Sequence, residues 1–555
     1  DRTVLSVGRV MTCVLGMVVR REREIRNFVK TPFYRVIGTF LSQDMKFDAE
    51  WRSVDGSCYF QSPKLYKENG FKERKDAEAL IAWLWERENG SENSGVMQSE
   101  VSDAGKANAG LMSVYNTSQG TILKVEKKKE TKNPPLLYNL AELQNDCSKM
   151  FKISPDQTLK VVQELYERKL VTYPRTDARV LSTAVAKEIS KNIGGLTHYE
   201  PLAAFASEAM QAGLWKNIAK TRYVNDKQIT DHYAIIPTGQ GLGALRSLPE
   251  LNRKIYQVIV RRFLSIFYPA AIYQKYAVEI EVKGEHFFAG FKVLKEVGYL
   301  KVAEIPKKKK DTAGESVGRT NRLEPGIDGN DAENPAGEAD GTDSSQPKVI
   351  DASHPEFIQM LEQLKKGMKV SLDDLQIKEG ETSPPKRYSS GSMILAMENA
   401  GQLIEDEELR AQIKGSGIGT SATRAEILKK LFNIKYMALN EKTQVITPTY
   451  LGELIYEVVH TSMKQLLNPE LTASWEKGLT YVAEGSITPD EYMQKLERFV
   501  IGRTYNAVHM GNAYGLRPAF DAVAVFYQNA GKEKKLNFKK GNDHEKRRNE
   551  NHRII

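Results

Sequence analysis

The length of the chain limits most strongly how it can fold. A chain of 555 residues is too long to be organised around one hydrophobic core, and domains of about 150 residues predict three or four separate units. Apolar residues make up 41% and charged residues 27% of the sequence, as in ordinary globular proteins, which excludes a mostly disordered chain, a collagen and a disulfide-rich secreted scaffold. We therefore expect several packed units joined by connecting segments.

The most apolar stretch, residues 255–273, does not predict a membrane span. It carries Arg261 and Arg262 in its middle, so we interpret it as a buried helix. The chain begins at Asp1 without a basic and then apolar leader, and its three cysteines lack the spacing of a zinc site or a disulfide framework. These features predict a reducing, cytoplasmic setting with no membrane partner.

Two segments are expected to stay solvated. Residues 311–347 contain nine acidic residues, two arginines and no aromatic residue, which is too little apolar surface to offset the entropy of ordering them. Residues 531–555 contain nine basic and four acidic residues, and they are either a solvated tail or a non-specific arm for nucleic acid. The net charge of +9 permits a polyanionic partner but does not establish one.

Local patterns predict both helices and strands. Ser154, Pro155 and Gln157 form the start of a helix with a capping box. Apolar and polar residues alternate over 276–282, as in a half-buried strand, whereas 392–500 has a chiefly helical pattern. The apolar face of the helix that begins after Ser154 is expected to comprise Leu159, Val162, Tyr166 and Leu170.

Tyr173 is the first candidate for a chemical role. Pro174 disfavours helical geometry at Tyr173, so the phenol should leave the preceding helix and lie on a turn. The guanidinium of Arg175 could contact the same anion in a bidentate manner. Because the pKa of a free tyrosine is about 10, a nucleophilic tyrosine needs positive charge or a base nearby. On its own, this spacing is more typical of a packed or hydrogen-bonded tyrosine.

A glycine-rich loop over residues 415–419 precedes a helix expected over 422–432. The loop amides, the hydroxyls of Thr420 and Thr423 and the helix dipole favour an anion, and Arg424 lies in the first helical turn. A plain loop with a Thr or Ser cap fits at least as well. Because no Gly-Lys-Ser/Thr sequence ends the segment, it is not a P-loop.

Two further segments are weak signals by themselves. His232 precedes an apolar run, where a lone histidine is more often structural. Residues 6–12 precede a basic helix expected over 14–28. Because Glu22 and Glu24 are interleaved with its arginines, the charged face of this helix is expected to be solvated rather than to follow a phosphate backbone.

The order of these segments along the chain carries more information than any one of them. The matching runs are Ser-x-Gly-Arg-Val at 6–10, 134–144 and 173–177 around the tyrosine, His-x-Ala-Ile-x-Pro at 232–237, Thr-x-Pro-Pro-x-Arg-Tyr at 382–388, Gly-x-Gly-Thr-x-Ala-Thr-Arg at 417–424, and 471–476. Collinear matches thus span about residues 4–500. In this order the segments resemble the type IA DNA topoisomerases, and most closely the bacterial topoisomerase III branch.

The resemblance implies a mechanism. Tyr173 would attack a phosphodiester of one DNA strand, leaving a 5′-phosphotyrosine and a free 3′ hydroxyl, and passage of another strand before religation would relax or decatenate DNA. ATP is not required because the ester conserves the energy of the bond, and Arg175 would stabilise charge on the scissile phosphate. The residues that would bind neighbouring phosphates are Ser6, Val7, Gly8, Arg9, Val10, Met11, His232, Thr423 and Arg424.

The implied architecture is an α+β multidomain chain with a toroid-like core, built from a β-rich hinge domain and helical domains. The DNA partner is expected to be single-stranded where it binds. The expected boundaries are 1–30 and 389–505 for the helical DNA-binding domain, 31–133 and 273–388 for the hinge domain, 134–272 for the tyrosine-bearing domain and 506–555 for a basic tail.

The family's N-terminal Toprim domain, with its catalytic Glu and its Asp-x-Asp pattern, has no match in this sequence. We therefore expect the ligands of the family's Mg²⁺ to lie outside this chain, and the chain alone to bind single-stranded DNA without relaxing supercoils. Met11 stands where the family usually has Gln, and Cys13 where Pro is common. The resemblance is compatible with a helicase partner and does not set the oligomeric state.

Two other functions are considered. The main alternative is a non-catalytic remnant that binds single-stranded DNA, but the retained Tyr173 and Arg175 argue against it. A tyrosine recombinase or a relaxase fits less well. Recombinases need several Arg and His residues around a tyrosine near the C-terminus, relaxases need a metal-binding His cluster, and neither pattern occurs here.

Overall fold

The computed structural model describes residues 5–86, 118–303, 347–350, 354–405, 407–412, 417–509 and 515–527. Of the segments predicted to be solvated, 311–347 lies outside the described residues except for Pro347, and 531–555 lies outside them entirely. The described side chains form three separate hydrophobic cores, and the predicted α+β class is confirmed. In the described part of the chain, no helix is long and apolar enough to cross a membrane.

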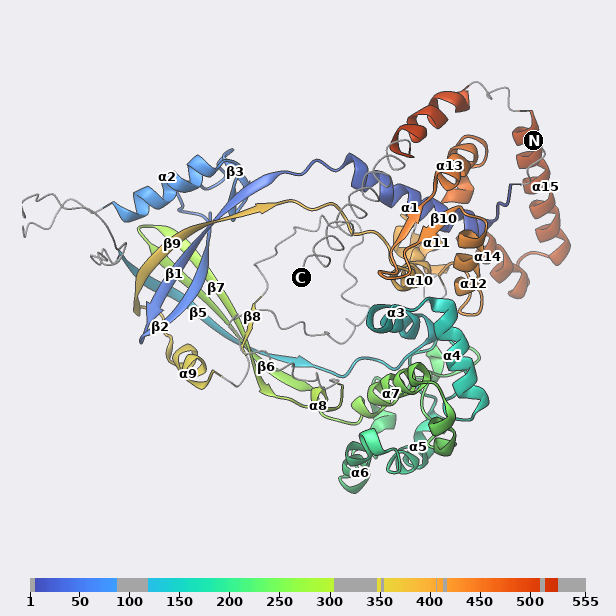
Figure 1. Cartoon of the computed structure of the whole chain (residues 1–555), viewed down its shortest axis with the longest axis horizontal. Helices are drawn as coiled ribbons and strands as arrows, with labels where there is room; N and C mark the ends of the chain where they lie inside the picture. Colours follow the sequence, from blue (N-terminus) through green and yellow to red (C-terminus); the bar gives the residue numbers. More distant parts are fainter. Residues whose placement is uncertain are drawn as a thin grey trace, which may run out of the picture.

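The first unit is a barrel of six long strands, β1 (Pro32–Ser42), β2 (Met45–Arg52), β5 (Ser118–Lys132), β6 (Ala271–Val282), β7 (Glu285–Glu296) and β9 (Lys369–Glu381). The strands pair antiparallel in the circuit β1–β2–β7–β6–β5–β9 and back to β1, so the sheet closes on itself (Figure 1). Three short strands extend it: β3 (Leu65–Lys67) and β4 (Gly70–Phe71) beside β1, and β8 (Lys348–Ile350) parallel to β7.

Aromatic and small side chains together allow this barrel to close. Alternate residues of β6 are buried, among them Val278 and Ile280, which confirms the strand predicted over 276–282. The Phe40 and Phe287 rings pack in the same core with centroids 5.4 Å apart. A Cβ at Gly120 would lie 2.8 Å from Ile280 Cγ2, so β5 needs a glycine at this close approach. Helices α2 (Arg74–Trp85) and α9 (Pro355–Gln363) complete the core.

The second unit, called the tyrosine unit, has its own core and is mainly helical. Its helices are α3 (Leu140–Phe151), α4 (Pro155–Glu167), α5 (Thr183–Leu196), α6 (Ala203–Gln211), α7 (Glu250–Ser265) and α8 (Leu300–Ala303), with short 3-10 helices η1 (Glu200–Leu202), η2 (Ile218–Lys220), η3 (Asp226–Gln228) and η4 (Leu242–Ser247). The predicted capping box is confirmed: Ser154 Oγ accepts from Gln157 N at 3.2 Å, and Gln157 Oε1 accepts from Ser154 N at 3.1 Å.

The buried helix predicted over 255–273 is present as α7, but it ends earlier, at Ser265. Arg261 and Arg262 are buried in this helix, and Arg262 pairs with Asp146 at 3.0 Å. Residues from Ala271 onward belong to strand β6 instead. The proline at 269 disfavours a helix in the residue before it, which explains why the apolar run changes from helix to strand.

The third unit, called the helical unit, combines an early helix with elements from residue 390 onward around one core. Its elements are α1 (Arg9–Asn27), α10 (Ser390–Glu398), η5 (Ala400–Leu403), α11 (Glu407–Gln412), α12 (Arg424–Asn433), β10 (Met437–Leu439), β11 (Ile446–Pro448), α13 (Tyr450–Ser462), η6 (Lys464–Leu467), α14 (Glu470–Ala483), α15 (Pro489–Val508) and a helix over 515–527. The helix over 515–527 lies inside the segment predicted as a basic tail.

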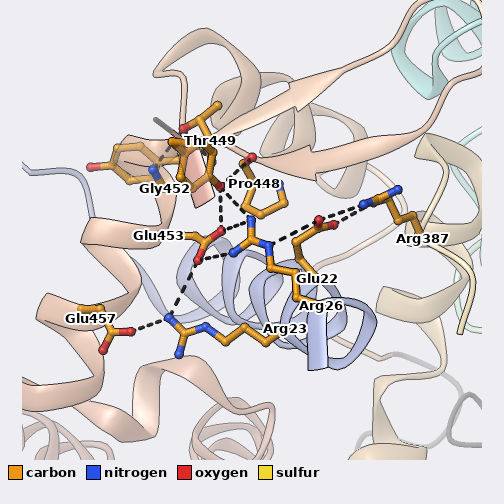
Figure 2. Close-up of polar contacts among 11 residues, drawn as sticks. Glu22, Arg23, Arg26, Arg387, Pro448, Thr449, Gly452, Glu453 and Glu457 are labelled. Carbon is orange, nitrogen blue, oxygen red and sulfur yellow. Dashed lines mark hydrogen bonds and ion pairs between the residues drawn. The ribbon is translucent and has the colours of Figure 1, made fainter. Parts of the chain in front are cut away.

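Ion pairs hold α1 against the rest of the helical unit (Figure 2). Arg26 lies 2.7 Å from Glu453 of α13, and Glu22 accepts two hydrogen bonds from Arg387, at 2.7 and 2.9 Å. Glu22 and Glu453 are both buried. The prediction of a solvated charged face on α1 is therefore wrong, because these acidic residues and Arg387 make it an internal contact between distant parts of the sequence.

The barrel takes part in all described backbone connections between the three units (Figure 1). Every described connection between units starts or ends in the barrel, so no described backbone runs directly between the tyrosine unit and the helical unit. These two units meet where α3 packs on α10, and there Ser148 Oγ and Ser390 Oγ lie 3.2 Å apart. We call this contact the junction; it closes the ring that the three units form. The connections are 28–31 and 382–389 to the helical unit, and 133–139, 266–270 and 297–299 to the tyrosine unit.

Candidate functional site

Tyr173 lies on a loop that follows α4, here called the tyrosine loop (residues 171–177). Thr172 Oγ1 donates a hydrogen bond to the main chain of residues 232–237 at 3.1 Å and accepts one from it at 3.0 Å. Thr176 Oγ1 donates to the carbonyl oxygen at residue 232 at 2.7 Å. The residues on both sides of Tyr173 are thus tied to the run that carries the predicted histidine.

Two rings flank the partly buried phenol. The His232 ring lies with its centroid 4.3 Å from that of Tyr173, at an interplanar angle of 41°. The Tyr166 ring meets Tyr173 edge-on, with centroids 5.5 Å apart. Arg175 is exposed, and it forms no hydrogen bond or ion pair with other described residues. The structure therefore brings Tyr173 and His232 together and leaves the Arg175 guanidinium facing solvent beside them.

Tyr166 does not lie where the sequence pattern predicts it. It was expected on the apolar face of α4, but 39% of it is exposed, and its ring packs on Tyr173. The helix ends at Glu167, and Lys169 adopts a left-handed conformation with φ of 60°. This turn carries the chain back past the end of α4, which places the tyrosine loop against a side chain that the helical period assigned to the core.

Arg424, the first residue of α12, is almost completely buried, with 1% of its surface exposed. Its Nη1 donates to Asp177 Oδ1 at the end of the tyrosine loop, at 2.9 Å. The preceding glycine loop is fixed to the end of α10: Ile418 N donates to Met397 O at 2.9 Å, and a Cβ at Gly417 would lie 2.2 Å from that oxygen. The guanidinium of Arg424, which was expected to bind a DNA phosphate, thus pairs with a carboxylate of the chain itself.

A second polar contact crosses the junction next to this ion pair. Asn139 caps α3 by accepting from Glu142 N at 2.9 Å, while its Nδ2 donates to Glu398 Oε1 at 2.6 Å and to Asp177 O at 3.2 Å. The pKa of Glu398 is raised to about 7, chiefly by burial and also by the charges of Asp177 and Glu142, against the opposing effect of Arg424. Glu398 is therefore partly protonated near neutral pH.

Sequence reasoning did not assign a role to either partner of this contact. Asn139 carries a local signal, since an asparagine immediately before an apolar helical pattern is typical of an N-cap. Glu398 carries none, because it is the last residue of an ordinary helix. Its role depends on a contact with Asn139, a residue 259 positions away in the sequence.

The other predicted DNA-binding residues lie on the helical unit. Arg9 pairs with Glu476 at 2.9 Å, and Met11 is buried in the core. Thr423 is exposed, and its Oγ1 accepts from Thr420 N at 3.0 Å. No hydrogen bond, ion pair or ring contact between described residues joins this group to Tyr173. The exposed or partly exposed members of the early segment are Ser6, Val7, Gly8, Arg9 and Val10.

The carboxylates near Tyr173 do not fit a divalent cation. In the described part of the chain, no group of three or more His, Cys, Asp or Glu side chains could hold a metal ion. Asp177 is paired with Arg424, and Glu398 accepts a hydrogen bond from Asn139. Their bonded partners are thus an amide donor and a guanidinium, not the further oxygen ligands that Mg²⁺ requires.

Comparisons with known proteins identify a family and a fold. A family model described as DNA topoisomerase matches residues 1–326 and 342–494. DNA topoisomerase 3 of Bacillus licheniformis and that of Bacillus subtilis are each 29% identical over 499 residues, which is 89% of this chain and 55% of theirs. The chain therefore spans about half the length of these curated relatives. The solved structure of full-length topoisomerase I from Thermotoga maritima shares the fold, with a TM-score of 0.54 and 19% identity over 90% of this chain and 63% of that one.

Proposed function

The chain belongs to the DNA topoisomerase family that this model describes, and from that premise we propose that Tyr173 is the nucleophile of a type IA cleavage reaction on single-stranded DNA. The observation that supports this most directly is the tyrosine loop itself. Hydrogen bonds fix the loop on both sides of the phenol, the His232 ring packs against it, and the Arg175 guanidinium is exposed two residues away.

The proposed reaction is a transesterification. The Tyr173 oxygen forms a bond to phosphorus while the bond from phosphorus to the 3′ oxygen breaks, and the phenol proton ends on the released 3′ oxygen. The strand is then held as a 5′-phosphotyrosine. Attack by the 3′ hydroxyl reverses the step after another strand has passed, so DNA is relaxed or decatenated with no need for ATP, because the number of ester bonds is unchanged.

The neighbouring residues have different proposed roles. Arg175 neutralises charge that develops on the scissile phosphate, which is a preorganised electrostatic role. His232, Thr423 and the exposed part of residues 6–10 bind phosphates on either side of it. Arg424 acts through Asp177 instead, since its guanidinium is buried. A partly buried phenol cannot reach a phosphate inside an intact duplex, which favours single strands.

The family resemblance also implies Mg²⁺. Because the carboxylates beside Tyr173 face Arg424 and Asn139, we assign no metal ligand among the described residues. No step of the proposed chemistry passes through a metal held by them. In the experiment that follows, Mg²⁺ is simply present in the reaction buffer.

The test uses the longest natural polypeptide that contains these 555 residues, and a single-stranded oligonucleotide labelled at one end. After the reaction is stopped with denaturant, the protein is expected to carry the fragment with the 3′ label and to release the fragment with the 5′ label. Tyr173→Phe should abolish the adduct. Tyr166→Phe, which removes the neighbouring hydroxyl but keeps the ring, should retain it.

Each contrary result has a defined meaning. A covalent adduct on the 5′-labelled fragment would show the opposite polarity and contradict a type IA reaction. An adduct that persists in Tyr173→Phe would assign the nucleophile to another residue. If the unmodified protein binds the oligonucleotide and never forms an adduct, the alternative of a non-catalytic single-strand-binding protein replaces this proposal.

A further inference from the structure

The residue at the end of the tyrosine loop, Asp177, is held from the helical unit as well as from its own unit. Its carboxylate accepts from Arg424 of α12 at 2.9 Å. Its carbonyl oxygen accepts from Asn139 at 3.2 Å, and the same amide donates to Glu398 of α10 at 2.6 Å. One contact that crosses the junction therefore reaches Asp177 directly, four positions after Tyr173, and a second reaches it through Asn139.

The partners in the helical unit are themselves fixed. Glu398 is the last residue of α10. The glycine loop that leads to Arg424 is hydrogen-bonded to the preceding residue of this helix, because Ile418 N donates to Met397 O. A Cβ at Gly417 would lie 2.3 Å from Glu398 O, so the loop passes this residue at a distance that only glycine allows. Arg424 and Glu398 are therefore tied to each other through this loop within the helical unit.

We propose that Arg424 and Glu398 are positioning residues for Tyr173, which hold the tyrosine loop in its cleaving conformation only while the junction is closed. This role rests on the proposed function of Tyr173 as the nucleophile. When the tyrosine unit and the helical unit separate, Asp177 loses Arg424, and Asn139 loses Glu398. The loop then keeps only contacts within its own unit, among them those of Thr172 and Thr176 and the bond from Asn139 to Asp177 O.

The physical consequence is a coupling between closure of the ring and chemistry. In-line attack requires the phenol oxygen, the phosphorus and the 3′ oxygen to be aligned, and a displacement of about 1 Å can cost roughly 100-fold in rate. Cleavage and religation are therefore fast with the junction closed and slow with it open. While another strand passes through the open ring, the tyrosine loop is therefore not in the conformation that religates the cleaved strand.

The chain offers a matched control for this role. Lys429 of α12 pairs with Asp156 of α4 at 3.6 Å, which also connects the two units, but neither residue contacts the tyrosine loop in the described structure. If Arg424 and Asp177 served only to hold the units together, loss of the Lys429–Asp156 pair should act in the same way. If they position Tyr173, the two pairs should differ in their effect on catalysis.

The experiment measures the rate constant of adduct formation at saturating oligonucleotide, and separately the Kd for that oligonucleotide, in the same polypeptide as above. Asp177→Asn and Arg424→Gln are each expected to lower the rate constant about 10-fold or more, with Kd unchanged within about twofold. The double variant should be no slower than the slower single variant, because both remove one interaction. Lys429→Gln should stay within about twofold of the unmodified protein.

The outcomes separate this inference from the proposed function. Additive losses in the double variant, or equal losses in Lys429→Gln, would overturn the positioning role even when Tyr173→Phe abolishes the adduct. An adduct that survives in Tyr173→Phe would remove the premise instead. Because a variant at buried Arg424 can lose its fold, Glu398→Ala supplies an independent test: it deletes the contact with Asn139 and should slow adduct formation while the melting curve stays cooperative.

Discussion

At the scale of single residues, Glu398 and Asp177 are two carboxyl groups that share one cation, Arg424. The pKa of Glu398 is raised to about 7, mainly by burial, with Arg424 acting to lower it and Asp177 acting to raise it. Below that pH the neutral Glu398 leaves the Arg424 charge to Asp177. Above it, Glu398 adds a second negative charge near the Arg424–Asp177 pair, with Glu142 and Arg179 as the other charged groups that act on the site.

This pattern predicts a pH-dependent stability. The folded protein keeps the Glu398 proton that the unfolded chain releases above its ordinary pKa of 4.5. The stabilisation is therefore fully present below pH 4.5 and is lost as the pH rises through about 7. Glu398→Gln is always neutral, so its free energy of unfolding relative to the unmodified protein should rise between pH 5 and pH 8, by about 3 kcal/mol at most.

The measurement is thermal or urea unfolding of both proteins across that pH range, with Glu441→Gln as a control at an exposed position of the same unit. The control should show a constant difference from the unmodified protein. A difference for Glu398→Gln that stays flat from pH 5 to pH 8 would mean that the carboxyl is solvated and that its neighbours do not hold the proton.

The same residues show how far sequence reasoning reaches at this scale. The order of motifs predicted that Tyr173 and His232 belong to one site, and their rings do pack together. The loop before α12 was predicted to bind an anion, which stays a prediction, and the Arg424 side chain pairs with Asp177 of the chain itself. Neither this pairing nor the role of Glu398 could be predicted, because both depend on how α10 packs against a helix far away in the sequence.

At the scale of helices and strands, local sequence patterns predict structure well, whereas long-range contacts cannot be predicted from them. The capping box of α4 and the alternation in β6 involve residues within a few positions of one another, and both predictions are confirmed. Closure of the barrel requires β1 to pair with β9 and β5 with β6. No local pattern specifies such a register, since the partner strands are separated by 100 residues or more.

Helix α1 shows that a pattern of charges alone does not predict whether a helix face is exposed to solvent. Its alternating charges suggested a solvated face, but Arg26 pairs with Glu453, whose side chain is 1% exposed. Arg26→Met should lower the free energy of unfolding by about 3 kcal/mol, because it leaves most of the charge of buried Glu453 without its partner. Urea unfolding measures the loss, and Lys495→Gln, which breaks an exposed pair on α15, should cause no measurable change.

A loss in Arg26→Met that is no larger than in Lys495→Gln would show that water reaches Glu453. In that case the cluster in Figure 2 would contribute little to the assembly of the helical unit. The expected result would instead identify buried ion pairs as the contacts that join the early helix to a unit encoded more than 350 residues later.

At the scale of the whole molecule, the path of the backbone decides where the ring can open. The barrel is joined to each of the other two units by at least two described segments, whereas no described stretch of backbone crosses the junction. Separation at the junction breaks only packing, hydrogen bonds and ion pairs. Separation of the barrel from a unit would have to move two covalent connections at once, so the junction is the expected gate for strand passage.

A disulfide across the junction tests this directly. Ser148 and Ser390 are buried on facing helices with their oxygens 3.2 Å apart, which is close to the geometry that two cysteines need. In a Cys58→Ser background that removes the exposed thiol, oxidised Ser148→Cys/Ser390→Cys should still form the covalent adduct with a short oligonucleotide. It should lose relaxation and decatenation at least about 10-fold, because the ring can no longer open.

Reduction should restore strand passage in the same sample, and the single variant Ser390→Cys should be active under oxidising conditions. If the crosslinked protein relaxes DNA as fast as the reduced one, the ring must open elsewhere and the argument from the backbone path fails. If the crosslink abolishes adduct formation as well, the junction must open before cleavage. That order would conflict with Arg424 and Glu398 holding Tyr173 in place while the junction is closed.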